Sequence, residues 1–222
     1  MALIRFDRVT VTRRGAVLLS DISFTVRSGQ KTGLTGPSGS GKSTVLLTLL
    51  GACPVSSGDV FFDSDRVCPA TVARIRRSVA YIGQEPVLGA RTVDEALRLP
   101  FTFRANRRTA PDADRITAVL AQVGLDSSLL PRRVQTVSGG EKQRLAIARA
   151  LLLDKRVFLC DEITSALDDG SREAILRLFS DPDFTVLSVA HDEQWLSRCD
   201  TVWTVRDGRL IDRKEVDDHG NH

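Results

Sequence analysis

A glycine-rich octet in the first quarter of the chain has the residue types that bind phosphate groups. Its residues are Gly36, Pro37, Ser38, Gly39, Ser40, Gly41, Lys42 and Ser43. Small residues let successive backbone N–H groups turn toward an anion, and a following helix adds the positive end of its dipole. We expect Lys42 to reach the β- and γ-phosphates of a nucleotide and the Ser43 hydroxyl to bind Mg²⁺. The next residue, Thr44, belongs to the same predicted phosphate-binding set.

The octet satisfies the P-loop pattern, and its place in the chain supports that interpretation. The segment 31–35 predicts a short strand before it, and residues 43–50 have the apolar density of a buried helix after it. A glycine-rich turn beside a surface lysine is the alternative. Because the pattern lies between a strand and a helix, the sequence favours phosphate binding.

An acidic pair, Asp161-Glu162, follows the apolar residues 157–160. Open α/β sheets bind ligands at the carboxyl ends of their parallel strands, where this pair is expected. Asp161 would complete the Mg²⁺ shell, and Glu162 would polarise an attacking water as general base. An acidic pair after a strand is usually a solvated loop, so this prediction depends on the P-loop upstream.

A second candidate phosphate site opens the helix expected at residues 141–153. Ser138, Gly139 and Gly140 precede this helix and would expose backbone donors at its positive end. An ordinary serine cap beside a flexible Gly-Gly pair is the alternative. One chain needs only one cradle for its own nucleotide, so the second is expected to close over the nucleotide of another copy.

These motifs require an α/β fold with a mostly parallel sheet. Alternating apolar residues around positions 4–11 and 22–26 predict antiparallel strands at the N-terminus, and residues 79–82, 156–160 and 185–190 predict further strands. Between residues 85 and 149 the pattern becomes helical, with Ile116, Val119, Leu120 and Val123 on one face, Pro111 before them and Gly124 as the stop. We therefore expect one domain over residues 1–222, with a core of 1–84 and 150–222 and an inserted helical subdomain of 85–149.

The composition excludes several classes of protein. A net charge of +3 is too small for a nucleic-acid footprint, and the local arginine runs are interpreted as solvated surface, so no nucleic-acid partner is expected. The four cysteines form no C-x-x-C pair, which argues against a zinc or disulfide framework. No signal peptide is recognisable and no apolar run approaches the ~18 residues of a membrane span. A cytoplasmic location is expected, and any channel must come from another chain.

The segment Ser138-Gly139-Gly140-Glu141-Lys142-Gln143 resembles the signature sequence of ATP-binding cassette (ABC) proteins, which is a far narrower marker than a P-loop. Further motifs follow in that family's order: Gln84 resembles the Q-loop glutamine, Ser165 to Asp168 resemble the D-loop, and His191 resembles the switch histidine. The resemblance covers essentially the whole chain.

The resemblance implies a RecA-like P-loop core and an ATPase that works as a head-to-tail dimer around two molecules of ATP with Mg²⁺. It also implies an integral membrane transporter subunit as partner, at the inner face of the cell membrane. Gln84 would sense Mg²⁺ and couple to that partner. His191 would contact the γ-phosphate and steady the attacking water, and Asp168 would work across the dimer interface.

One departure from the family pattern concerns the adenine. The stretch where the family usually places an aromatic stacking residue, 11–15, contains none. Arg13 could stack its guanidinium on the base, or it could be an ordinary surface arginine.

The cargo is predicted from weaker features. The stretches 161–168 and 84–101 resemble bacterial iron-export ATP-binding subunits, so iron or another metal is the expected cargo. An ABC subunit for another solute, a soluble ABC ATPase of DNA repair or translation, and a non-hydrolysing nucleotide sensor remain alternatives.

Overall fold

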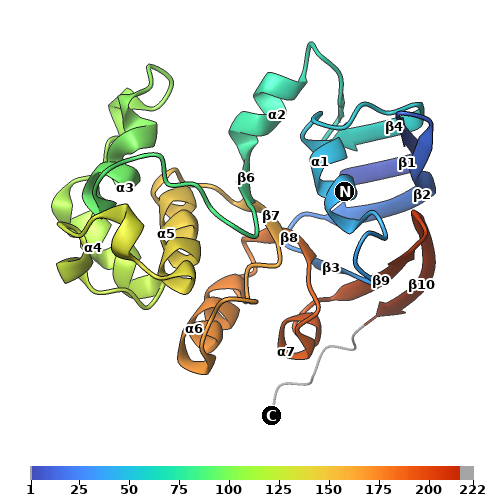
Figure 1. Ribbon diagram of the computed structural model, residues 1–222. Helices are drawn as coiled ribbons and strands as arrows, with labels where there is room; N and C mark the ends of the chain where they lie inside the picture. The colour runs from blue at the N-terminus through green and yellow to red at the C-terminus, as the bar shows by residue number, and fades with distance from the viewer. Residues whose placement is uncertain (1, 216–222) are drawn as a thin grey trace. The chain divides into compact units, whose positions relative to one another are not determined.

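The computed structural model describes residues 2–215, which form two compact units (Figure 1). The first unit contains residues 2–81, 157–162 and 182–215. The second unit contains residues 82–156 and 163–181.

A six-stranded sheet carries the first unit. In spatial order its strands are β10 (Arg209–Glu215), β9 (Thr201–Arg206), β3 (Lys31–Thr35), β8 (Thr185–Val189), β7 (Val157–Asp161) and β6 (Val79–Ile82). Strands β9, β3, β8 and β7 run parallel, and β10 pairs antiparallel with β9. Every residue of β7 and β8 is buried, which explains their nearly continuous apolar sequences. The helices described in this unit are α1 (Lys42–Leu49), α2 (Val72–Ser78) and α7 (Glu193–Leu196).

A second, antiparallel sheet in the same unit has the order β2-β1-β4-β5. Its strands are β1 (Ala2–Arg13), β2 (Ala16–Arg27), β4 (Ser57–Phe62) and β5 (Asp65–Arg66). Side chains alternate along β2, where Ile22, Phe24 and Val26 are buried and their neighbours are exposed. This period of two is the pattern that the sequence shows over the same residues.

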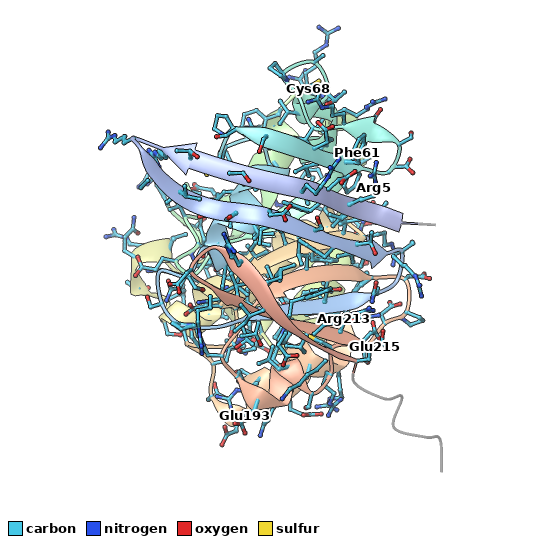
Figure 2. All side chains as sticks on the ribbon, turned by 90° about the vertical axis from the view of Figure 1, so that its right-hand side faces the viewer. Arg5, Phe61, Cys68, Glu193, Arg213 and Glu215 are labelled. Atoms are coloured by element: carbon cyan, nitrogen blue, oxygen red, sulfur yellow. The ribbon has the colours of Figure 1, made fainter. Side chains whose placement is uncertain are left out.

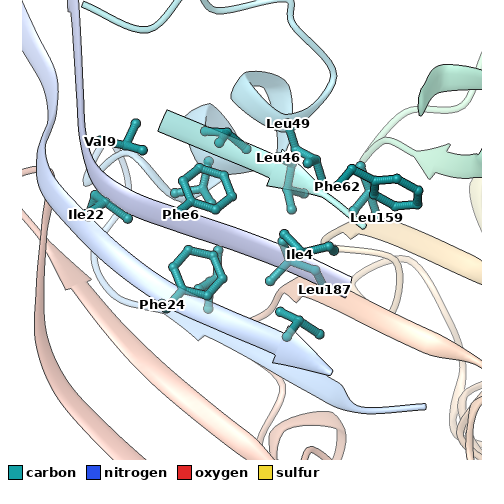
Figure 3. Close-up of a cluster of buried hydrophobic side chains, with 14 of the residues drawn as sticks. Ile4, Phe6, Val9, Ile22, Phe24, Leu46, Leu49, Phe62, Leu159 and Leu187 are labelled. Carbon is teal, nitrogen blue, oxygen red and sulfur yellow. The ribbon is translucent and has the colours of Figure 1, made fainter. Parts of the chain in front are cut away.

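The buried side chains of both sheets meet in one core (Figure 3). The rings of Phe6 and Phe24 stack with their centroids 4.8 Å apart. Leu46 of α1, Leu159 of β7 and Leu187 of β8 belong to the same cluster and are fully buried. Because burying such a side chain contributes about 2 kcal/mol, the cluster fixes α1 firmly against both sheets.

Two arginines of this unit, Arg5 and Arg213, lie over aromatic rings (Figure 2). The Arg5 guanidinium lies 4.0 Å from the centroid of the Phe61 ring, and that of Arg213 lies 5.5 Å from Trp203. The same Arg213 pairs with Glu215 at 2.6 Å. These cation–π contacts cover faces of the aromatic rings while the charges stay in water.

The second unit is helical. It comprises α3 (Val93–Thr102), α4 (Ala113–Gln122), α5 (Gly139–Leu152) and α6 (Asp169–Phe179), with short 3₁₀ turns η1 (Arg107–Thr109), η2 (Ser127–Leu129) and η3 (Val134–Thr136). Each of these α-helices has a polar N-cap whose side chain accepts a hydrogen bond from a backbone amide of the first turn. In chain order, the caps are Thr92, Asp112, Ser138 and Asp168. Such caps satisfy amides that have no partner inside the helix.

Most predicted elements are confirmed within two residues, and the predicted α/β fold is confirmed. The apolar face of α4 is buried as expected, and Gly124 ends it with φ +68°. The helix predicted from Glu141 begins at Gly139, because Ser138 already caps it. Across residues 2–215, no helix has the length and hydropathy of a membrane span.

The helical unit is larger than the expected insertion of residues 85–149. It begins at residue 82, ends at residue 156 and also takes in residues 163–181, which the sequence had assigned to the core. Two glycines explain this extension. A Cβ on Gly140 would lie 2.7 Å from the carbonyl oxygen of Ala166, and one on Gly124 would lie 3.7 Å from the Cβ of Ala174. The segment before α6 and α6 itself therefore pack closely on the helical unit.

Candidate functional site

The backbone of the P-loop connects β3 to α1 and requires glycine at two positions. Gly36 has φ +135°, and a Cβ there would lie 2.0 Å from the carbonyl oxygen of Val205. Gly41 has φ +104°, and its Cβ would lie 2.7 Å from the carbonyl oxygen of Leu18. Only a residue without a side chain fits such backbone angles and approaches. Both glycines are therefore needed to shape the loop.

The turn between β9 and β10 is hydrogen-bonded to the P-loop. The Gly208 amide donates to the Ser40 carbonyl at 3.0 Å, and the Gly208 carbonyl accepts from the Ser20 amide at 2.8 Å. Asp207 and Gly208 both have positive φ, as in the tight turns that join antiparallel strands. This support was not predicted from the sequence, although an Asp-Gly pair is a turn signal.

Lys42 is buried at the start of α1, inside the loop that it follows. Its ammonium donates to the carbonyls of Gly36 and Pro37, both at 2.8 Å. Burial lowers the pKa of Lys42, and the carboxylates of Glu162 and Asp161 oppose that shift. Pro37, Ser38 and Gly39 are exposed at the loop, whereas Ser40 is buried and Thr44 is half-buried.

The hydroxyl of Ser43 and the carboxylate of Asp161 meet beside the loop. Ser43 Oγ donates to Asp161 Oδ1 at 3.0 Å, and the Tyr81 hydroxyl donates to Oδ2 at 3.4 Å. Burial raises the pKa of Asp161, against the hydrogen bond from Ser43. Burial and the Asp161 charge raise the pKa of Tyr81 to about 12, so its phenol remains a donor. Tyr81 has no local sequence signal, since it reaches Asp161 only through the sheet.

These groups can hold a hard cation. Mg²⁺ prefers oxygen ligands and is usually bound by one or two carboxylates together with water and substrate phosphates. The hydroxyl and carboxylate oxygens of Ser43 and Asp161 fit that donor set. Within residues 2–215 there is no cluster of three or more His, Cys, Asp or Glu side chains that would form a separate metal cage.

Glu162 and His191 follow β7 and β8 at the same edge of the sheet. The Glu162 amide donates to the Val189 carbonyl at 2.9 Å, and Glu162 has φ +54°. Its Oε1 lies 3.7 Å from Nε2 of His191. A residue held at positive φ is strained, and such strain is concentrated at functional sites. The first unit thus contains Lys42, Ser43, Asp161, Glu162 and His191.

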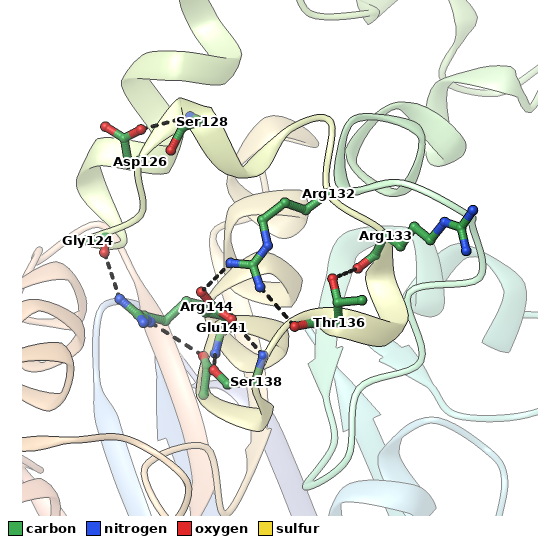
Figure 4. A network of polar contacts seen from close by, with 10 residues as sticks. Gly124, Asp126, Ser128, Arg132, Arg133, Thr136, Ser138, Glu141 and Arg144 are labelled. Atoms are coloured by element: carbon green, nitrogen blue, oxygen red, sulfur yellow. Dashed lines mark hydrogen bonds and ion pairs between the residues drawn. The ribbon is translucent and has the colours of Figure 1, made fainter.

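The second candidate phosphate site is the N-terminus of α5 (Figure 4). Ser138 Oγ accepts from the Glu141 amide at 3.1 Å, and Glu141 Oε2 accepts from the Ser138 amide at 2.6 Å. This reciprocal capping box fixes the first turn, in which Gly139 and Gly140 leave the backbone uncovered. The sequence analysis identified the serine cap but not its glutamate partner.

Asp168 lies in the same unit, as the N-cap of α6. Its two carboxylate oxygens accept from the amide and the hydroxyl of Ser171, at 2.9 and 2.8 Å. The hydrogen bond from that amide lowers the pKa of Asp168.

The Gln84 segment is tied to α5. The Gln143 amide nitrogen donates to the Gly83 carbonyl at 3.2 Å, and Arg149 donates to the carbonyls of Leu88 and Val87 at 3.2 and 3.4 Å. Gln84 is exposed two residues after β6. Burial lowers the pKa of Arg149.

Arg13 lies at the end of β1, opposite Ala16, where the chain turns into β2. Its side chain is exposed. Stacking of Arg13 on adenine stays a prediction.

The chain is similar to known proteins in sequence. Residues 19–165 match the family described as "ABC transporter". The chain is 34% identical over 208 residues to "Probable iron export ATP-binding protein FetA" of Escherichia coli K12, covering 92% of this chain and 91% of that one. It is 35% identical over 207 residues to "Methionine import ATP-binding protein MetN" of Haemophilus influenzae, of which it spans 59%.

A solved structure shows the same architecture. It is the dimeric, post-hydrolysis state of the ATP-binding cassette MJ0796 bound to ADP and Pi, which superposes with a TM-score of 0.85 at 25% identity, covering 96% of this chain and 98% of that one. The family match, the match to the iron-export relative and the superposition on MJ0796 all indicate the same family. The chain therefore belongs to the ABC transporter family, as its ATP-binding, ATP-hydrolysing cassette.

Proposed function

We propose that two copies of this chain close head to tail around two molecules of Mg-ATP and so drive a membrane transporter. One observation carries the proposal: a phosphate cradle at α1 and a capped, glycine-bearing helix start at α5 occur in the same chain. In the closed dimer the P-loop of one copy binds the phosphates through its backbone, Lys42 and Thr44. Ser138, Gly139 and Gly140 of the twin cap them from the other side, with Asp168 at the same interface.

Hydrolysis is assigned to groups at the edge of the sheet. Ser43, Asp161 and Gln84 would hold Mg²⁺, which supplies charge neutralisation for the phosphates when bound. Glu162 accepts a proton from a water molecule while the oxygen of that water attacks the γ-phosphorus. The bond between the γ-phosphorus and the β–γ bridging oxygen breaks, and this oxygen leaves with ADP. His191, 3.7 Å from Glu162, steadies that water and the γ-phosphate.

The Glu162→Gln variant tests this assignment. Phosphate release should fall by about 100-fold or more, because general base catalysis typically contributes that much. The variant should still bind Mg-ATP and accumulate as a dimer in size-exclusion chromatography with light scattering. Glu193→Gln is a matched control, since Glu193 is an exposed carboxylate at the start of α7 in the same unit. Unchanged turnover of Glu162→Gln would remove Glu162 from the mechanism.

The helical unit carries the surface that we assign to the membrane subunit. A groove of about 570 Å³ is lined by Arg91, Asp94, Glu95, Arg98 and Leu99. Val87, held through its carbonyl by Arg149, is 83% exposed on the same unit. An apolar side chain beside a groove of mixed charge suits a short helix of another protein. We therefore propose that the chain works at the cytoplasmic face of the membrane, through its partner.

Detergent purification of the tagged chain tests the partner. An integral membrane protein should be recovered with it, and cysteine cross-linking from position 87 should capture that protein. Purification of nucleic acid at physiological salt in its place would contradict the proposal.

Iron or another metal is the cargo that we favour, with export as the direction. The support is the iron-export relative, which matches over almost the whole of both chains, whereas the methionine-import relative extends well beyond this chain. Inside-out vesicles containing the purified complex should accumulate ferrous iron only when Mg-ATP is added. ATP-dependent transport of a different solute, with no movement of iron, would establish the alternative that the cassette serves another cargo.

A further inference from the structure

The proposed ATP-capping site consists of Ser138, Gly139 and Gly140 at the start of α5, and a negative charge lies in the same helix turn. Glu141 is in the first turn of α5, and its Oε2 accepts the Ser138 amide at 2.6 Å. That hydrogen bond lowers the pKa of Glu141, so its carboxylate is ionised at neutral pH. The Glu141 side chain is only 20% exposed, so water screens its charge incompletely. A bound triphosphate would be repelled unless a nearby cation compensates.

Arg132 is placed to give this compensation. Its Nη1 lies 3.5 Å from Glu141 Oε1, and its Nη2 donates to the Thr136 carbonyl at 2.9 Å (Figure 4). The second bond holds the guanidinium over the short segment that leads into α5. Arg144 is also close, but it donates to the carbonyls of Gly124 and Gly140, at 2.6 and 3.4 Å. Arg132 is therefore the cation that pairs directly with the free oxygen of Glu141.

The same network orients the hydroxyl of Ser138. Ser138 Oγ accepts the Glu141 amide at 3.1 Å, so the hydroxyl hydrogen points elsewhere. A serine held in this way is a ready donor to an external oxygen anion, provided that Glu141 keeps its position. Arg132 fixes the second oxygen of that carboxylate and so supports both the charge balance and the geometry.

We propose that Arg132 is a positioning residue of the ATP-capping site, which neutralises Glu141 so that the start of α5 can accept the γ-phosphate of the nucleotide bound by a second copy. This inference rests on the proposed sandwich dimer and adds to it a residue outside the signature segment. A surface ion pair of this length contributes little to folding. The ion pair acts in the closed dimer, where the phosphates of the second copy's nucleotide contact the start of α5.

The experiment measures closure directly. In the Glu162→Gln background, full-length chains are titrated with Mg-ATP, and the dimer fraction is followed by sedimentation velocity. Arg132→Met should raise the ATP concentration at half-maximal dimerisation about tenfold, the size of one uncompensated charge a few ångströms from phosphate in a partly screened site. Arg132→Lys, which keeps the charge, should stay within about twofold of the parent.

Two further variants separate charge from structure. The double variant Arg132→Met with Glu141→Gln removes both charges, and it leaves the Thr136 carbonyl without its donor. Its ATP concentration at half-maximal dimerisation should return to near that of the parent. Arg133→Met removes a neighbouring charge whose side chain points away from Glu141 in Figure 4, and it should have no comparable effect. Binding of a fluorescent ATP analogue to the isolated chain at low protein concentration should be the same in all variants.

The outcomes are decisive. An unshifted Arg132→Met, a double variant as weak as the single one, or an equal effect of Arg133→Met would each overturn the role of Arg132. If the parent itself fails to dimerise with Mg-ATP, the proposed sandwich fails first, and that result is seen before any Arg132 variant is compared.

Discussion

Two glycines of the P-loop, Gly36 and Gly39, should respond very differently to the same substitution. Both have positive φ, but their surroundings differ. A Cβ on Gly36 would lie 2.0 Å from the carbonyl oxygen of Val205, whereas nothing lies within 4 Å of a Cβ on Gly39. Replacing each with alanine therefore separates backbone strain from a steric collision within one loop.

The magnitudes follow from those surroundings. Gly39→Ala should cost about 1 kcal/mol, the strain of an alanine in the left-handed region. Gly36→Ala has φ +135°, which costs about 1–3 kcal/mol, and the overlap with a backbone oxygen adds about 1–3 kcal/mol. Both variants gain about 0.4–1 kcal/mol from a less flexible unfolded chain, which cancels in the comparison. Gly36→Ala should thus be about 1–5 kcal/mol less stable than Gly39→Ala.

Urea and thermal unfolding measure this difference. The two tryptophans of the chain, Trp195 and Trp203, both belong to the first unit, so their fluorescence reports on the part that contains the loop. For a chain of this size the difference corresponds to about 2–20 °C in Tm. Gly36→Ala should also lose binding of fluorescent ATP at temperatures where it remains folded, because the loop must move away from β9.

Equal stabilities of the two variants would refute the reasoning. So would a Gly36→Ala protein that unfolds within about 1 kcal/mol of the parent, since that result would mean that β9 yields easily to the new methyl group.

Three other predictions concern the reactivity of Cys68, the charge of Glu141 and the partly buried guanidinium of Arg149. Hydrogen bonds from Thr71 lower the pKa of Cys68, so Thr71→Val should slow iodoacetamide labelling of Cys68 near pH 7 and have less effect as pH rises through the ordinary thiol pKa. Glu141 has a lowered pKa, so its charge stabilises the fold above pH 4.5; Glu141→Gln should be destabilised at pH 7 in urea titrations, with a penalty that shrinks as pH falls below 4.5. Arg149→Met removes a donor from the Leu88 carbonyl and should cost about 1–3 kcal/mol, with faster hydrogen exchange in residues 83–90.

Local patterns explain how much of the fold was predictable. The strands at Lys31–Thr35 and Val79–Ile82 were predicted with their observed ends. The first directly precedes the glycine-rich loop and the second is an apolar run, and both signals lie in neighbouring positions. The capping pair of Ser138 and Glu141 has a local signal as well, the serine three residues before a glutamate, which the sequence analysis did not use for Glu141.

Long-range contacts explain what was missed. Tyr81 meets Asp161 because β6 and β7 are neighbours in the sheet, and Gly208 supports Ser40 because β9 lies beside β3. Nothing near Tyr81 or Gly208 in the chain indicates these partners. The helical unit extends beyond the expected residues 85–149 for the same reason, since the contact of Gly140 with Ala166 joins distant segments.

By itself the sequence determined the chemistry available to this protein: a glycine-rich loop with Lys42, an acidic pair after a strand and a glycine-bearing helix start, each contained in a few consecutive residues. Only the tertiary structure decided which of these groups meet, because Ser43, Asp161 and His191 come together through the order of parallel strands in the sheet. It also decided which neighbours tune them, since burial and distant partners set the pKa values of Lys42 and Asp161.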